Sequence, residues 1–257
     1  MIDVEEAKAL YAKGDTMGAA DMMERIVGRQ MEAGESADTL LQPLEELTFL
    51  AAILRSQGQL DRSRELMQCV LDARVKLLGE DDPLTVGSMR NLAGTLFAQD
   101  DFAAVAALER RVLGARRRTL GDDHPDSLQS LGVLGTILAD QGDLKQARDL
   151  LEQSLTAHIR VFGVDTPETD GALRSLARVV YEQRDATRLN ALLTIEGEPL
   201  HWRSLQNAGD IEGARAELEH ALAQHRRVLG EDHPATLELA QDLASLSARR
   251  RLWRHRT

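Results

Sequence analysis

The chain has 257 residues, of which 43% are hydrophobic and 3% aromatic, and its formal net charge is −11. This acidic balance repels nucleic acid and anionic lipid, so we expect neither as a partner. No apolar run reaches the roughly 18 residues of a membrane span, and the start lacks a signal peptide. The single cysteine, Cys69, excludes an internal disulfide. We expect a soluble, cytoplasmic protein, and the excess of arginine over lysine favours a bacterial source.

Two short phrases alternate along the chain and predict its helices. The first contains a glycine and then a proline, and its copies lie at 78–83, 120–125, 162–167 and 229–234. A glycine can end a helix in the left-handed conformation and a proline suits the first turn of the next. The second phrase marks tight reversals at 57–60, 99–102, 141–144 and 183–186. Two marks in each period of 42 residues predict two antiparallel helices in each repeat.

The predicted elements begin with a hairpin that turns at residues 14–15, between helices over 4–13 and 16–31. Regular repeats then occupy about 38–183. Apolar residues return at helical spacing on both sides of each turn, which predicts amphipathic helices. We expect a single all-α domain over 1–257, a solenoid of about six helical hairpins plus a capping helix.

The array breaks its period once, over 186–208. The turn after Arg184 comes 25 residues later instead of 42, and the glycine-proline phrase is missing there. Short helices are predicted over 186–193 and 200–207. Such a break marks either a functional site or a decaying repeat near the end of a solenoid. Trp202 in this junction either replaces missing packing or lines a pocket.

The last predicted helix, over 235–250, caps the final hydrophobic face. Basic residues follow over 249–256, so that 235–257 reads as a capping helix with a basic tail. The tail either contacts nucleic acid or an acidic partner, or is a solvated terminus that balances the acidic body.

One segment carries a family resemblance. Residues 120–163 combine the glycine-proline phrase, a helix with Ser130 and Leu131, a Gln-Gly-Asp turn, and the pair Ala147 and Arg148. This combination resembles a tetratricopeptide repeat of the long, 42-residue kinesin light chain type, over about 38–183 and again over 200–250. The resemblance implies a right-handed superhelix whose relatives mostly bind peptides or proteins, and it implies no catalytic activity.

The resemblance also implies that the first helix of each hairpin lines a concave groove. Aligned on the turns, the groove positions hold five arginines and no carboxylate. Guanidinium groups bind carboxylates or phosphates in a bidentate way, and an asparagine amide both donates and accepts. The expected ligand-binding residues are Arg55, Arg90, Asn91, Phe97, Thr136, Arg174, Arg178, Tyr181 and Arg203.

Two details of this groove stay open. The fourth repeat contributes only small groups, so a gap is expected between the third and fifth repeats. The arginines serve a ligand, pair internally or form a solvated surface. Internal pairing is open because Asp140 and Glu182 stand one position beyond the groove set.

Sites for catalysis are not indicated. The sequence has no glycine-rich phosphate loop and no nucleophile elbow, so we predict no catalytic residue, metal or cofactor. His220 and His225 lie five apart, which does not suit a zinc pair, and we expect both at the surface or an edge. Cys69 is expected to be inert.

The favoured function is a non-catalytic adaptor or regulator that binds a protein or peptide with acidic or C-terminal carboxylate groups. Two alternatives remain. One is a small-molecule-binding or enzymatic solenoid that uses the gap between the third and fifth repeats. The other is a peptide-sensing regulator that acts through a partner. No oligomeric state is predicted.

Overall fold

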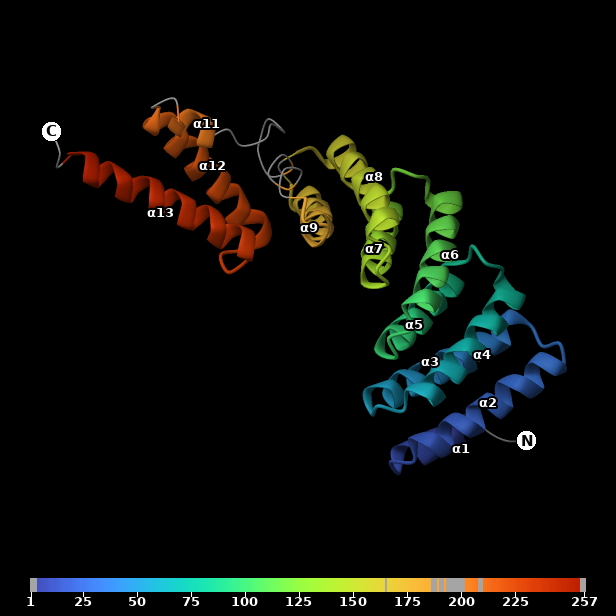
Figure 1. Cartoon of the computed structure of the whole chain (residues 1–257). Helices are drawn as coiled ribbons and strands as arrows, with labels where there is room; N and C mark the ends of the chain where they lie inside the picture. The colour runs from blue at the N-terminus through green and yellow to red at the C-terminus, as the bar shows by residue number, and fades with distance from the viewer. Residues whose placement is uncertain are drawn as a thin grey trace. The chain divides into compact units, whose positions relative to one another are not determined.

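The computed structural model describes residues 4–164, 166–185, 189, 192, 202–207 and 210–254, without the side chains of 203, 204 and 247–254. The chain divides into two compact units, Met1–Gln141 (unit 1) and Gly142–Thr257 (unit 2), which we describe separately. Every element among the described residues is a helix, as the sequence predicts (Figure 1). The single domain over 1–257 stays a prediction.

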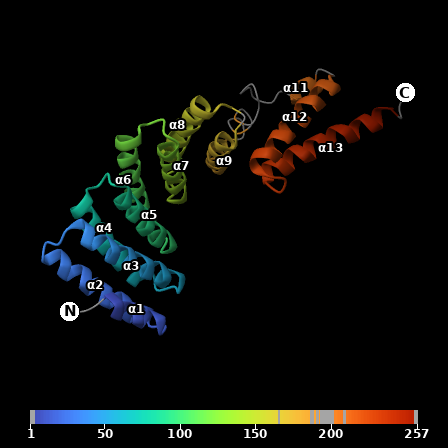
Figure 2. The same ribbon diagram turned by 180° about the vertical axis from the view of Figure 1, so that it is seen from behind.

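Unit 1 is a stack of antiparallel helices. They are α1 Val4–Ala12, α2 Thr16–Glu32, α3 Ala37–Ser56, α4 Leu60–Leu78, α5 Pro83–Ala98, α6 Phe102–Leu120 and α7 Pro125–Asp140. Each helix packs against the next one in the chain. The first helix of each hairpin, which we call the leading helix, lies on one side of the unit, and the second, the return helix, lies on the other (Figure 1, Figure 2). The leading helices α1, α3, α5 and α7 therefore share one face.

Unit 2 continues the alternation with fewer regular hairpins. Its helices are α8 Leu144–Phe162, α9 Pro167–Glu182, α11 Trp202–Asn207, α12 Ile211–Leu229 and α13 Pro234–Arg254. The predicted helix over 200–207 is confirmed as α11, and the one over 235–250 as α13. The short helix predicted over 186–193 lies outside the described residues except for Leu189 and Leu192, and the end of the basic tail lies outside them too.

The residue before each helix-starting proline caps that helix. In α5 and α9 the cap is a side-chain oxygen: Asp82 accepts a hydrogen bond from the Leu84 amide at 2.8 Å, and Thr166 accepts one from Thr169. His124 does the same with Nδ1, which accepts from the Asp126 amide at 3.1 Å. A histidine with an unprotonated Nδ1 can therefore replace aspartate at this position.

Polar contacts link the return helices α4 and α6 to the leading helices that follow them, α5 and α7. Arg74 of α4 donates to Ser88 Oγ of α5 at 2.9 Å, and Arg116 of α6 donates to Ser130 Oγ of α7 at 2.8 Å. Both arginines occupy the same position of their helix. We call these contacts the arginine–serine rungs. They pair each serine hydroxyl with a guanidinium donor of the neighbouring helix.

Unit 2 uses histidine at the rung position. His158 and His225 each donate from Nδ1 to a carbonyl of their own helix, at 2.8 Å and 2.9 Å. The serine of the next leading helix is replaced by Ala172 and Leu239, which are buried. Because its Nδ1 proton is satisfied within its own helix, neither histidine needs the serine hydroxyl as an acceptor, although Nε2 of His225 has no hydrogen-bond partner among the described residues. The expectation that His225 lies at a surface or edge was wrong, because its exposed fraction is 0%.

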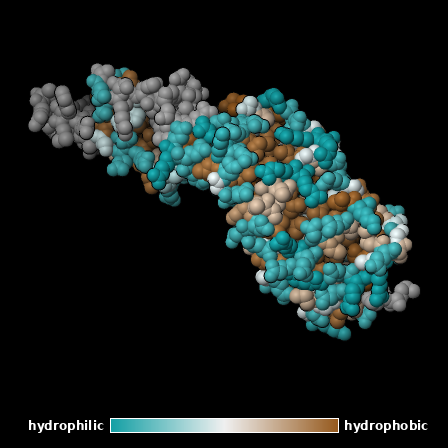
Figure 3. Space-filling model, turned by 45° about the vertical axis from the view of Figure 1, so that its right-hand side comes forward, coloured by the Kyte–Doolittle hydropathy of each residue, from teal (hydrophilic) through white to brown (hydrophobic). Residues whose placement is uncertain are grey.

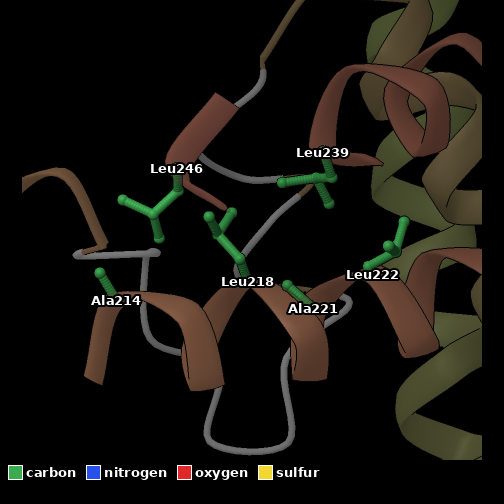
Figure 4. Packing of buried hydrophobic residues seen from close by; sticks show 6 residues of the cluster. All are labelled: Ala214, Leu218, Ala221, Leu222, Leu239 and Leu246. Carbon is green, nitrogen blue, oxygen red and sulfur yellow. The ribbon is translucent and has the colours of Figure 1, made fainter. Parts of the chain in front are cut away.

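One hydrophobic core cluster of unit 2 lies between α12 and α13. Leu239 and Leu246 of α13 point toward a row of small and branched residues on α12 (Figure 4): Ala214, Leu218, Ala221 and Leu222. Trp202 of α11 packs against this cluster, which agrees with the packing alternative for that residue. On the outside, hydrophilic side chains cover most of the surface that Figure 3 shows, with hydrophobic ones between them.

One carboxylate lies in the core of unit 1. Glu109 of α6 is only 7% exposed, at a position where the other return helices bury Met23, Met67, Leu151 and Leu218. Burial raises the pKa of Glu109 above its ordinary value, while the charges of Arg90 and Arg116 act in the opposite direction. The ionised side chain is therefore costly where a leucine would be favourable.

We expect Glu109→Leu to stabilise unit 1 by about 1 to 3 kcal/mol at neutral pH, because it replaces a buried charge with an apolar side chain of similar size. Urea unfolding followed by circular dichroism measures this. The gain should shrink as the pH falls toward the raised pKa, since the wild-type carboxyl is then neutral in the fold. The reverse change at the equivalent position, Leu151→Glu, should destabilise the protein. A loss of stability in Glu109→Leu would instead mean that the arginine charges more than offset the burial.

We expect acidification from about pH 7.5 to about pH 5.5 to destabilise the α12 and α13 pair. Burial lowers the pKa of His225 below its ordinary value of 6.5. The unfolded chain therefore binds more protons below that value, and stability is lost as the pH falls through it. Melting temperatures across this range should fall less steeply in His225→Leu. The exposed His220 on the same helix is the control, because His220→Leu should leave the slope unchanged.

Candidate functional site

The leading helices of unit 1 expose several large apolar side chains on their shared face. Phe49 of α3 is 51% exposed and Phe97 of α5 is 47% exposed. The ring of Tyr11 from α1 meets Phe49 edge to face, with centroids 5.6 Å apart. Exposed apolar side chains gathered on one face are typical of a protein contact surface. We call this surface the leading face of unit 1, formed by Tyr11, Phe49, Arg55, Arg90, Asn91, Phe97 and Val133.

Arg55 reaches from α3 across to α5. A Cβ atom added at Gly94 would lie 2.7 Å from Arg55 Nη1, so the missing side chain at Gly94 leaves room for the guanidinium. Along α5, Gly94 is one helical turn from both Arg90 and Phe97. The structure thus brings three of the predicted ligand residues, Arg55, Arg90 and Phe97, to one stretch of α5.

Arg90 is exposed and lies within electrostatic reach of the buried Glu109. The sequence analysis missed Glu109. The sequence could have indicated it, because a charged residue stands there at a position that is apolar in the other return helices. No ion pair within 4.0 Å joins Arg55 or Arg90 to a carboxylate of the described residues, so their guanidinium groups keep donors for a ligand.

Asn91 and Thr136 differ in whether their side chains already form hydrogen bonds within the protein. The Thr136 hydroxyl donates to the Gly132 carbonyl of its own helix at 3.0 Å. The Asn91 side chain makes no hydrogen bond to another described residue, and it is half-buried beside Arg90. Its amide can therefore donate and accept at the same time, as an extended peptide backbone requires.

The predicted site residues of α9 in unit 2 are engaged within the chain. Arg174 Nε donates to the Val228 carbonyl of α12 at 2.9 Å. Arg178 Nη1 lies 3.5 Å from Glu182 Oε1, one helical turn away, so the alternative of internal pairing with Glu182 holds for this residue. The Tyr181 ring stands edge to face on the ring of His233, with centroids 4.7 Å apart.

Two predictions fall outside this geometry. The backbone of Arg203 lies in α11, but its side chain is outside the part of the chain that the structure describes. The expected gap between the third and fifth repeats would have Arg90 in unit 1 as one wall and Arg174 in unit 2 as the other. It stays a prediction, because these walls belong to separately described units.

Other chemistry finds little support in the described part of the chain. No three His, Cys, Asp or Glu side chains there lie together as ligands of a metal ion. Burial raises the pKa of the Cys69 thiol, and the charges of Glu24 and Asp72 raise it further, so the unreactive thiol form is favoured. None of the helices described combines the length and the apolar character needed to cross a membrane.

The comparison with protein families matches three models of the tetratricopeptide repeat. One matches residues 44–118 and 107–158, the second matches 133–188, and the third matches 203–235. Together they cover more than half of the chain. The comparison with curated protein sequences gives no match.

Solved structures share the fold at low sequence identity. A Podosopora anserina protein, whose repeats are described as nearly identical, TPR-like and of kinesin light chain type, has a TM-score of 0.53 at 21% identity, over 87% of this chain and 93% of that one. BtubC (BKLC) from P. vanneervenii has a TM-score of 0.51 at 15% identity, over 96% and 88%. The apo form of RapI has a TM-score of 0.51 at 13% identity, over 97% and 83%.

Proposed function

Because the chain belongs to the tetratricopeptide repeat family, we propose that it is a non-catalytic recognition module, an adaptor or regulator, that binds a protein or peptide. Repeats of this family generally mediate such contacts, and the fold by itself carries no activity. We further propose that the partner presents acidic or C-terminal carboxylate groups to the leading face of unit 1. A cytoplasmic location is part of the proposal and is supported by the single cysteine.

The observation that carries this proposal is the placement of Arg55 over Gly94. It sets one guanidinium on α5 beside Arg90, next to the exposed ring of Phe97. Two cations near an apolar surface suit a peptide with a carboxylate and an apolar side chain, since the ion pairs are strengthened where water is partly excluded. Asn91 adds a free amide for the peptide backbone.

The engagement of Arg174 and Arg178 within unit 2 is a reason to place the site in unit 1. An arginine that already donates to a carbonyl or a carboxylate has fewer donors for a ligand. The proposal therefore ranks Arg55, Arg90 and Asn91 above the α9 residues as first contacts.

We expect the double variant Arg55→Ala/Arg90→Ala to weaken binding of a fluorescein-labelled octaglutamate peptide by about tenfold or more, equivalent to about 1.4 kcal/mol. Fluorescence anisotropy at two salt concentrations measures the affinity, and helicity should stay unchanged. Asn91→Ala should weaken it less, because one neutral hydrogen bond is lost.

The matched control is Arg64→Ala/Arg110→Ala, which removes the same charge from exposed positions on the return helices α4 and α6. If both double variants weaken binding equally, attraction is general and the leading face of unit 1 is not the site. Affinity purification from the native host with mass spectrometry then tests whether the recovered partner depends on Arg55 and Arg90.

A further inference from the structure

In unit 2 the leading helix α9 packs against α12, a return helix of a later hairpin. Unit 1 shows no comparable contact among its described residues: there leading helices meet leading helices, and return helices meet return helices, whenever they are not consecutive. The contact brings α9 against the end of α12 and the turn that follows it. We call residues 228–234 the α12–α13 turn.

Three contacts hold the end of α12 and this turn on α9. Arg174 Nε donates to the Val228 carbonyl at 2.9 Å. Arg227 Nη2 lies 3.4 Å from Asp170 Oδ1, an ion pair outside hydrogen-bond geometry. The ring of His233 meets the ring of Tyr181 at an interplanar angle of 68°.

On α9 these contacts share one side of the helix. Asp170, Arg174, Arg178 and Tyr181 follow one another at helical spacing, and we call them the α9 face. Three of the four are positions that the sequence analysis assigns to a ligand. Asp170, Arg174 and Tyr181 of the α9 face are therefore in contact with the end of α12 and its turn, and Arg178 pairs with Glu182 of its own helix.

The group that Arg174 holds resembles an acidic ligand in its chemistry. Carbonyls in the last turn of a helix lack partners within the helix and carry the negative end of its dipole. Val228 belongs to the last turn of α12, so its carbonyl offers Arg174 a partly negative oxygen. A carboxylate of a partner would approach the same guanidinium.

We propose that the α12–α13 turn is an intramolecular competitor for the α9 face, so that an acidic segment of a partner reaches Arg174 and Tyr181 only when this turn is displaced. The inference rests on the proposed function, recognition of acidic groups by leading helices. It adds a second, closed site in unit 2 to the open one in unit 1. The apparent affinity of the α9 face is then reduced by the fraction of molecules in which the turn is bound.

Two substitutions can release the turn without removing a residue of the α9 face. His233→Asp removes the ring and keeps a helix cap, because Asp82 caps α5 from the equivalent position. Arg227→Gln removes the ion pair with Asp170. Both changes make the region more negative, so simple electrostatics predicts weaker binding of an acidic peptide.

The experiment has two readouts in full-length protein. Hydrogen exchange without ligand reports whether amides of 228–236 are released in His233→Asp/Arg227→Gln. Anisotropy then measures labelled octaglutamate binding, with Arg55→Ala/Arg90→Ala as the common background so that the α9 face is observed. We expect faster exchange and affinity raised about threefold or more, with the gain lost on adding Arg174→Ala.

The matched control is His124→Asp/Arg118→Gln, which makes the same changes at the equivalent positions of unit 1. His124 caps α7 as His233 caps α13, and among the described rings it has no aromatic partner. This control should leave both the exchange of 228–236 and the affinity unchanged.

Two outcomes overturn the inference alone. If hydrogen exchange of amides 228–236 is unchanged in the variant, these contacts do not hold the turn. If that exchange is faster but octaglutamate binds equally or more weakly, the turn does not compete. Absence of octaglutamate binding by the native chain would instead reject the proposed function, and the inference with it.

Discussion

Within each unit, the apolar faces of the described helices are buried by neighbouring helices of the stack, and the rest of the structure depends on that constraint. Isolated helices of this length are marginal in water, so a single hairpin has little stability of its own. Stability is therefore shared between neighbours. The leading helices bury one side and keep the other open, which leaves Phe49 and Phe97 exposed without weakening the core.

Arginine side chains form ion pairs with carboxylates throughout the described part of this acidic protein. Arg62 of α4 binds Asp21 and Glu24 of α2, at 2.7 Å and 2.6 Å, and Arg111 of α6 binds Glu80 at 2.6 Å. These pairs are partly exposed, so each adds little stability. An arginine on a leading helix has to be judged against this background. Arg178 follows the general pattern by pairing with Glu182, and Arg55 departs from it.

Local signals in the sequence were enough to predict the helices. A glycine, a cap and a proline act within a few residues, so the predicted turns at 57–60, 99–102 and 141–144 fall at the junctions between observed helices, whereas α13 extends four residues beyond its predicted end at 250. The candidate site was predictable only as a set of positions on leading helices. Whether Arg55 lies over Gly94, or Arg174 donates to Val228, depends on side-chain packing between helices that the period does not describe.

The failures lie where side-chain contacts decide the outcome. His225 was expected at a surface or an edge, but its Nδ1 proton is satisfied by the Ala221 carbonyl, which makes burial possible. Glu109 gave a signal only by comparison with the other repeats. The contact between α9 and α12 joins helices on either side of the irregular junction, and a rule based on regularity cannot place it.

The rungs limit how freely hairpins of this array could be exchanged. A return helix with arginine at the rung position needs serine on the following helix, as Arg74 needs Ser88. Joined instead to a helix with Leu239 at that place, the guanidinium would be buried without its side-chain acceptor. Histidine at that position imposes no such demand, because its hydrogen bond stays within its own helix. The interface, and not the hairpin, is thus the unit that duplication or engineering of this solenoid would have to preserve.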